Sequence, residues 1–356
     1  MTAVYIIVAI LFFGILIAIH ELGHFATAKL SDIRVEEFSI GMGPALLQKE
    51  KGETTYSLRA VPFGGYCAMT GEDGESDDPR AFVNAKFWKK VVVLCAGSFM
   101  NFVLGIILVL CFFIGAKAFA APVIESFMDG CPYQATETEQ GLCVGDRIRR
   151  IDGHRIFMYS DVSDFLNKGG DVHDILVIRD SEKVLIDDYK MVPVEYEGYE
   201  NKMYGFTFGY DEATFGSKLT HAWDMTMEFV RWVWMGLDQL FSGEANLNDL
   251  SGPVGIVNLM AETGEQSATV SDAVFNLLYL GAFIAVNLAV MNMLPIPGLD
   301  GGRLFLLIVS TIIEKITRKK LDPKYETYIN GAGMILLLAL MAFVMFNDIV
   351  RIVTGG

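Results

Sequence analysis

The sequence is poor in basic residues. Its 356 residues include 28 lysines and arginines against 43 acidic residues, and the formal net charge is −15. No stretch gathers lysine and arginine into a basic stripe, which is the electrostatic mark of a nucleic-acid-binding protein. The composition therefore excludes nucleic acid as a partner.

Charged side chains are also missing from several long segments. The chain is 52% hydrophobic, and a membrane-spanning helix needs about 20 mostly apolar residues. A fifth apolar run, 304–313, is too short to span and is interpreted as a packed or interfacial helix. The sequence predicts a polytopic α-helical membrane protein with four transmembrane helices, in the windows 3–19, 91–116, 273–298 and 329–346.

The first window lacks the features of a cleaved signal peptide. No basic residue precedes it and no small-residue cleavage site follows it, so we expect a retained helix. Basic residues concentrate instead in the link 301–329, which the positive-inside rule places in the cytoplasm. With four spans, both termini and the long segment 117–272 then lie outside, and the loop 29–90 lies inside.

The segments between the windows differ in character. Residues 36–72 have the alternation and turn residues typical of strands. The phrase GLCVGDRIRRIDGHRI, 141–156, resembles the core of the PDZ domains of bacterial proteases, with a generic small α+β domain as the alternative. The tryptophan-rich segment 217–242 is predicted to be a helix, either in the headgroup region or packed on the protein core. The expected domains are helices 1 and 2 with a β-rich membrane-associated loop (1–120), one extracytoplasmic PDZ domain (121–210), an amphipathic interfacial region (211–272), and helices 3 and 4 (273–356).

Cysteine is scarce, with five residues and no CxxC pair. Cys95 and Cys111 fall in the second window, where small buried hydrophobes are expected. Cys131 and Cys143 fall outside on the predicted topology, where a disulfide can form. The sequence leaves open whether these two are joined.

The motif HELGH, residues 20–24, ends the first apolar window. His20 and His24 are one helical turn apart on one face, so both imidazoles can reach one ion. Glu21 projects beside them and can hold a water, as in the HExxH zinc arrangement, where the glutamate is the general base. A chance match is the alternative, but ionisable groups inside a membrane are costly and functional by default. The motif therefore predicts a Zn²⁺ site.

A catalytic zinc usually has three protein ligands, and the phrase NMLPIPGLDGGR, 292–303, offers the third. Asp300 follows a run without ionisable groups, and Pro295 and Pro297 break the helix just before it. Broken backbone at membrane depth is tolerated where it is buried in protein or faces a cavity. A cytoplasmic turn carboxylate is the alternative for Asp300, and the two membrane cysteines are alternative ligands without an accompanying motif.

Together these features resemble the site-2 protease family of intramembrane zinc metalloproteases. HELGH in a first membrane helix, one PDZ domain between spans two and three, and NMLPIPGLDGG match its bacterial branch. Proteobacterial members carry two PDZ domains, whereas this chain has one. The resemblance implies that His20, His24 and Asp300 bind zinc and that Glu21 activates water. It also implies a bacterial plasma-membrane enzyme that cleaves transmembrane segments of single-pass proteins, such as anti-sigma factors or signal-peptide remnants.

The resemblance also suggests where a substrate would bind. The strand-rich loop would supply an edge on which an unwound segment adds as a strand, with the GMG phrase near the membrane face. A plain cytoplasmic hairpin is the alternative for this loop, and a helix-packing contact is the alternative for Asn101. The family's PDZ domain implies a size filter that admits proteins already trimmed by an upstream site-1-type protease. The candidate substrate-binding residues are Asn292, Asn101, Gly41, Gly43, Pro295 and Pro297.

Two other functions compete with proteolysis. One is an inert zinc-binding membrane scaffold whose PDZ domain recruits partners, but a scaffold has no need of Glu21 between its ligands. The other is a transporter, but four spans without an inverted repeat argue against it. We therefore expect a zinc metalloendopeptidase that acts within the lipid bilayer in regulated intramembrane proteolysis.

Overall fold

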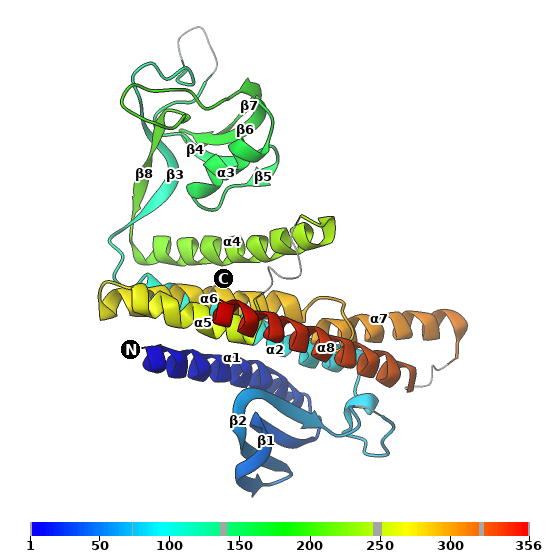
Figure 1. Cartoon of the computed structure of the whole chain (residues 1–356). Helices are drawn as coiled ribbons and strands as arrows, with labels where there is room; N and C mark the ends of the chain where they lie inside the picture. The colour runs from blue at the N-terminus through cyan, green and yellow to red at the C-terminus, as the bar shows by residue number, and fades with distance from the viewer. Residues whose placement is uncertain (1, 73, 136–140, 245–250, 320–323, 355–356) are drawn as a thin grey trace. The chain divides into compact units, whose positions relative to one another are not determined.

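The computed structural model describes residues 2–72, 74–135, 141–244, 251–319 and 324–354 (Figure 1). The chain divides into two compact units. Unit 1 comprises Met1–Phe112 and Phe229–Gly356, and unit 2 comprises Phe113–Glu228. Helix α4 (Phe215–Ser242) coincides with the helix expected at 217–242 and contributes to both units.

Unit 1 holds the helices that are long and apolar enough to cross a membrane. In the described residues these are α1 (Thr2–Leu30), α2 (Phe87–Phe112), α6 (Val270–Asn292) and α8 (Lys324–Thr354). They match the four windows, which confirms four candidate spans. The third window was predicted to run to residue 298, but α6 ends earlier. Pro295 explains this difference, because a proline ring clashes with the carbonyl four residues before it.

Small residues let α1, α2 and α6 pack closely. A Cβ on Gly23 of α1 would lie 2.4 Å from the carbonyl oxygen of Ala96 in α2. A Cβ on Gly105 of α2 would lie 2.6 Å from the side chain of Val286 in α6. Membrane helices associate through such close backbone approach, so α2 is held against both neighbours.

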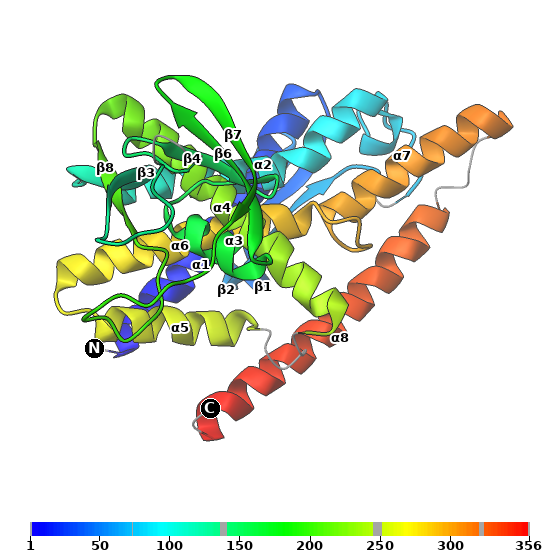
Figure 2. The same cartoon turned by 90° about the horizontal axis from the view of Figure 1, so that it is seen from above.

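The remaining helices of unit 1 lie around this group. Helix α5 (Pro253–Gln266) packs on α1, α6 and α8, and α7 (Asp300–Thr317) contains the short apolar run 304–313. Helix α7 is not among the candidate spans of the described residues. Seen from above, α8 runs from the end of α7 toward α5 (Figure 2).

The loop between α1 and α2 forms a sheet from two long strands, β1 (Val35–Lys51) and β2 (Thr54–Met69). Glu37 pairs with both Thr55 and Ala68, so the first part of β1 lies between the two halves of β2. The second part of β1 pairs only with the first half of β2. The end of β2 therefore has a strand on one side only, within the described part of the chain.

Glycines produce the bends that this folded-back sheet requires. Gly41 and Gly43 of β1 have φ of 86° and 81°, and Gly64 of β2 has φ of 91°. Side chains with a Cβ rarely adopt these values. The predicted GMG phrase is thus a bend within β1.

Unit 2 has the α+β organisation expected for residues 121–210. Its sheet has the strand order β7 (Glu182–Lys190), β6 (Val172–Arg179), β4 (Arg147–Ile151), β3 (Ala118–Phe127) and β8 (Phe206–Glu212), with β5 (His154–Arg155) paired to β4. Leu142, Ile148 and Ile151 of the GLCVGDRIRRI phrase are buried in its core. Cys131 and Cys143 are both free thiols. Helix α3 (Ser160–Lys168) lies between β5 and β6 in the chain.

Candidate metal centre

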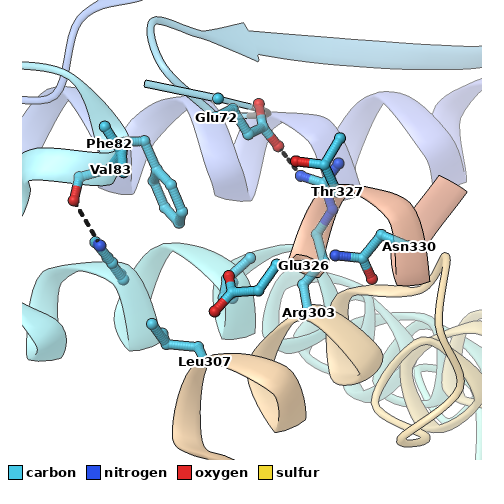
Figure 3. A pocket seen from close by; sticks show the side chains of 11 residues that line it. Glu72, Phe82, Val83, Arg303, Leu307, Glu326, Thr327 and Asn330 are labelled. Carbon is cyan, nitrogen blue, oxygen red and sulfur yellow. Dashed lines mark hydrogen bonds and ion pairs between the residues drawn. The ribbon is translucent and has the colours of Figure 1, made fainter. Parts of the chain in front are cut away.

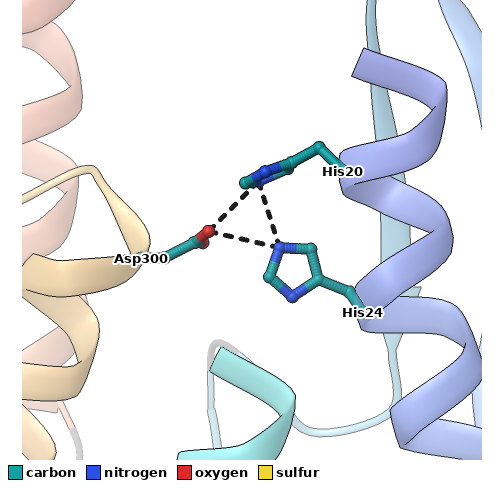
Figure 4. A group of neighbouring side chains, drawn as sticks. All are labelled: His20, His24 and Asp300. Atoms are coloured by element: carbon teal, nitrogen blue, oxygen red, sulfur yellow. Dashed lines mark hydrogen bonds and ion pairs between the residues drawn. The ribbon is translucent and has the colours of Figure 1, made fainter. Parts of the chain in front are cut away.

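Two histidines of α1 and one aspartate of α7 converge in unit 1 (Figure 4). The Nε2 atoms of His20 and His24 are 3.2 Å apart. Oδ2 of Asp300 lies 3.1 Å from His20 Nε2 and 3.2 Å from His24 Nε2. The structure therefore brings together the three side chains that the sequence predicted as a ligand set.

The triangle that these atoms form fits a zinc ion. Bonds from zinc to nitrogen and oxygen are about 2.0–2.2 Å, so ligand atoms at tetrahedral corners are about 3.3–3.6 Å apart. The observed separations are only a few tenths of an ångström shorter. Oδ2 of Asp300 is buried and receives no well-aligned hydrogen bond, which is costly for a carboxylate oxygen. A cation inside the triangle would satisfy all three atoms.

Helix α2 packs against both imidazoles. Nδ1 of His24 lies 2.8 Å from the carbonyl oxygen of Val93. This contact orients the ring, and in a neutral imidazole with its proton on Nδ1 it leaves Nε2 available to a metal ion. A Cβ on Gly97 would lie 2.4 Å from His24 Nε2 and 2.6 Å from His20 Cε1. The rings can therefore occupy these positions only because residue 97 has no side chain.

The two asparagines predicted to hold substrate lie beside His20. Nδ2 of Asn101 is 3.4 Å from His20 Nδ1, and Nδ2 of Asn292 is 3.5 Å from the same atom. Asn101 is fully buried, whereas Asn292 is half-buried. Both amides thus lie beside the Nδ1 edge of the His20 ring, on the opposite side from Nε2.

A tight turn delivers Asp300 to the centre. A Cβ on Gly301 would lie 2.3 Å from the carbonyl oxygen of Met293, and one on Gly302 would lie 2.1 Å from that of Ile296. The segment therefore folds onto itself between α6 and α7, and Asp300 is the first residue of α7. The prolines and glycines of the motif act here as backbone-shaping residues.

Glu21 and the three converging side chains line a cavity of about 630 Å³. The end of β2, from Tyr66 to Met69, forms one wall of this cavity, and a Cβ on Gly65 would lie 3.2 Å from Glu21 Cγ. Glu36, Glu72 and Arg303 add polar groups to the lining. The cavity thus brings a strand end, a carboxylate and a candidate metal centre together.

The comparisons with known proteins agree with this geometry. A model of Peptidase family M50 matches residues 8–340. The chain belongs to Peptidase family M50. This is the site-2 protease family that the motifs resembled, so that prediction is confirmed. The chain is a zinc metalloprotease, and its long apolar helices are those of a membrane protein.

Relatives in the family align over nearly their whole length. A protein of Clostridium perfringens is 38% identical over 354 residues, which cover 97% of this chain and 98% of the relative. A protein of Clostridium acetobutylicum is 36% identical over 350 residues, or 97% of each chain. Each is named as a predicted zinc metalloprotease. The regulator of sigma-W protease RasP of Bacillus subtilis is 26% identical over 435 residues, covering 98% of each chain.

An ion pair that sequence reasoning missed lies at the rim of the cavity. Glu72, just after β2, pairs with Arg303 of α7 (Figure 3). Both also line a second cavity of about 70 Å³, together with Glu326 and Asn330 of α8. No local signal marks this pair, because its members are 231 positions apart in the chain.

Cys67 of β2 also lines the larger cavity. Burial raises the pKa of its thiol. A protonated thiol is a poor metal ligand, since the thiolate is the coordinating form. Cys67 also lies outside the cluster of converging ligand atoms in the described residues. The predicted candidates Gly41, Gly43, Pro295 and Pro297 are not in the lining and shape the backbone around it.

Proposed function

We propose that this zinc metalloprotease hydrolyses peptide bonds within transmembrane segments of single-pass membrane proteins. One observation carries the proposal: His20, His24 and Asp300 converge at α1, a helix apolar enough to cross a membrane. A soluble protease would have no reason to place its ligands there, because ionisable groups are expensive in such a segment.

The side chains of the site would have different roles in the reaction. His20, His24 and Asp300 would hold the metal through the three atoms that face one another. Zinc, when bound, supplies a Lewis acid that polarises a carbonyl and makes a water more acidic. Glu21, next to His20 in the cavity, would accept the proton of the attacking water. The same carboxyl would then donate that proton to the leaving amine.

The cavity suggests how a substrate reaches these groups. A helix shields its peptide bonds with internal hydrogen bonds, so the segment must unwind before it is cut. The end of β2 has a partner strand on one side and lies beside Glu21. An unwound segment could add there as a further strand. The bends at Gly41 and Gly43 would hold this edge in shape, and Pro295 and Pro297 would shape the turn before Asp300. Asn292, beside His20, would hold the substrate backbone.

The substrate class and the topology complete the proposal. One relative is named as a regulator of sigma-W protease, which supports anti-sigma factors as substrates beside signal-peptide remnants. An upstream site-1-type protease would first trim the outer part of the substrate. Both termini and unit 2 would lie outside the plasma membrane, in accordance with the basic link 301–329.

Unit 2 would act as a single PDZ domain. Its phrase GLCVGDRIRRIDG supplies β4 and the buried core around it. A cavity of about 420 Å³ lies between α3 and β8, with Val162 and Asn167 on one side and Phe206 and Phe208 on the other. Helix-and-strand grooves of this kind accept extended peptides in PDZ domains.

Co-expression with a single-pass model substrate tests the proposal. The substrate should carry a trimmed outer domain, and Glu21→Gln should be compared with the wild type on a gel. We expect a shorter product only with the wild type, while both proteins retain zinc. A product with both variants would remove Glu21 from the mechanism. A product with neither, with zinc bound, would favour the scaffold function.

A further inference from the structure

Each ligand histidine needs a hydrogen-bond acceptor behind its ring. The Nε2 atoms of His20 and His24 face the centre of the ligand triangle. A neutral imidazole that binds metal through Nε2 carries its proton on Nδ1, and that proton is usually donated to a carboxylate, carbonyl or water. For His24 the acceptor is the carbonyl oxygen of Val93, at 2.8 Å.

The corresponding neighbours of His20 are two carboxamides. Asn101 and Asn292 each bring an amide group within 3.5 Å of His20 Nδ1. Asn101 is fully buried, and its Oδ1 has no hydrogen-bond partner. A half-turn of a carboxamide exchanges its oxygen and nitrogen at nearly constant shape. After that half-turn, Oδ1 of Asn101 lies where it can accept the Nδ1 proton of His20.

The spacing along α2 supports this pairing. Val93, Gly97 and Asn101 are four residues apart and therefore share one face of α2. His24 and His20 are likewise four residues apart on α1. Along this face, the carbonyl oxygen of Val93 contacts Nδ1 of His24, and the carboxamide of Asn101 contacts Nδ1 of His20. Gly97, between them, leaves room for both rings. Each histidine of α1 therefore has a hydrogen-bonding group of α2 beside its Nδ1 atom, and the two groups are about two helical turns apart on α2.

We propose that Asn101 is a positioning residue for the metal centre. By accepting the Nδ1 proton of His20, it fixes the orientation and tautomer of that ring and keeps Nε2 directed at zinc. This inference rests on the proposed zinc ligands. It differs from the sequence-based assignment of Asn101 to substrate binding. A positioning residue affects zinc retention even when no substrate is present.

Zinc retention by the full-length protein in detergent tests the inference. The zinc-loaded protein is titrated with a chelator, and the released zinc is followed with a colorimetric indicator in the absence of substrate. Asn101→Leu has similar size but no acceptor, whereas Asn101→Asp keeps one. Loss of such an outer-shell partner typically weakens metal binding by about tenfold to hundredfold, which is the effect expected for Asn101→Leu. Asn101→Asp is expected to hold zinc as the wild type does.

Ser98→Ala provides the matched control. Ser98 lies on the same helix, is buried, and has a hydroxyl without a hydrogen-bond partner. Its truncation tests whether any polar change in this part of α2 disturbs the centre, and we expect unchanged zinc retention. Circular dichroism and thermal unfolding establish that each variant is folded, and Asn101→Ala serves as a second variant without an acceptor.

Three results would be decisive. Wild-type zinc retention in Asn101→Leu, together with a raised KM for a model substrate, would overturn the inference in favour of substrate contact. Equal losses in Asn101→Leu and Asn101→Asp would also overturn it, since shape rather than an acceptor would then matter. If His24→Ala retained as much zinc as the wild type, the proposed ligand set itself would fail, which separates the two proposals.

Discussion

The carboxylate of Asp348 in α8 accepts a hydrogen bond of 2.8 Å from the backbone amide of Gly255 in α5. The same oxygen accepts a bond of 3.0 Å from Gly252, so it caps the first turn of α5. A Cβ on Gly252 or Gly255 would lie 2.8 or 2.7 Å from an oxygen of Asp348. This contact gives the two glycines of the phrase SGPVGI, 251–256, a structural role.

Removal of this cap should destabilise the contact between α5 and α8. Asp348 is buried, and in Asp348→Ala the amides of Gly252 and Gly255 lose their acceptor. A buried group left without a partner costs about 1–3 kcal/mol, so we expect a lower midpoint of thermal unfolding in detergent. Asp348→Asn keeps an acceptor and should lie between the alanine variant and the wild type. An unchanged midpoint for Asp348→Ala, beside the exposed control Thr354→Ala, would contradict the role of the cap.

Gly97→Ala should impair zinc binding although it replaces none of the proposed ligands. The added methyl group would lie 2.4 Å from His24 Nε2, so the ring must move away from the centre. We expect weaker zinc retention by about tenfold or more, as for other disturbances around metal ligands. The measurement is zinc content after dialysis against a chelator. Gly236→Ala on α4 has open space around it and should retain zinc fully; equal behaviour of the two variants would refute the packing argument.

Gly65→Ala should displace the side chain of Glu21 and leave the proposed metal ligands in place. Its Cβ would lie 2.9 Å from the carbonyl oxygen of Ser39 and 3.2 Å from Glu21 Cγ. A small misplacement of a catalytic group lowers the rate by up to about a hundredfold. We expect a lower kcat with unchanged zinc content, in contrast to Gly97→Ala. Gly170→Ala, in open space within unit 2, is the control. Loss of zinc from Gly65→Ala would show that β2 supports the metal ligands as well.

Alkylation of Cys67 should depend steeply on pH. Burial raises the pKa of this thiol, and only the thiolate reacts quickly. In a variant with the other four cysteines replaced by serine, iodoacetamide should react slowly at pH 8. The rate should then increase about tenfold per pH unit, because the thiolate fraction does. A plateau near pH 9, measured by mass spectrometry of the labelled protein, would indicate an ordinary thiol and an open β2 edge.

The three proposed zinc ligands could be predicted because their signals are local. A helix places His20 and His24 on one face whatever surrounds it. The long run without ionisable groups before Asp300 made that carboxylate conspicuous, and the prolines beside it indicated a turn. The four candidate spans of the described residues could be predicted for the same reason, since length and apolar composition are properties of a continuous segment.

The supporting contacts could not be predicted, because each joins residues far apart in the chain. Asn101 meets His20 across 81 positions, and Glu72 meets Arg303 across 231. Contacts between residues so far apart produce no periodic pattern in the sequence. The strands at 36–72 were expected, but not that the first part of β1 pairs with both halves of β2. That pairing depends on glycine bends whose φ angles appear only in the folded chain.

If substrates dock on the one-sided end of β2, as proposed above, that edge influences how this enzyme distinguishes them. A segment that docks along a strand edge is held through amide and carbonyl groups, which every residue possesses. Such an edge distinguishes poorly between amino-acid sequences. Under the proposed function, it would favour a membrane helix whose own hydrogen bonds break at low cost, as at glycine or proline. The cleavage point would then follow local helix weakness in the substrate rather than a consensus sequence.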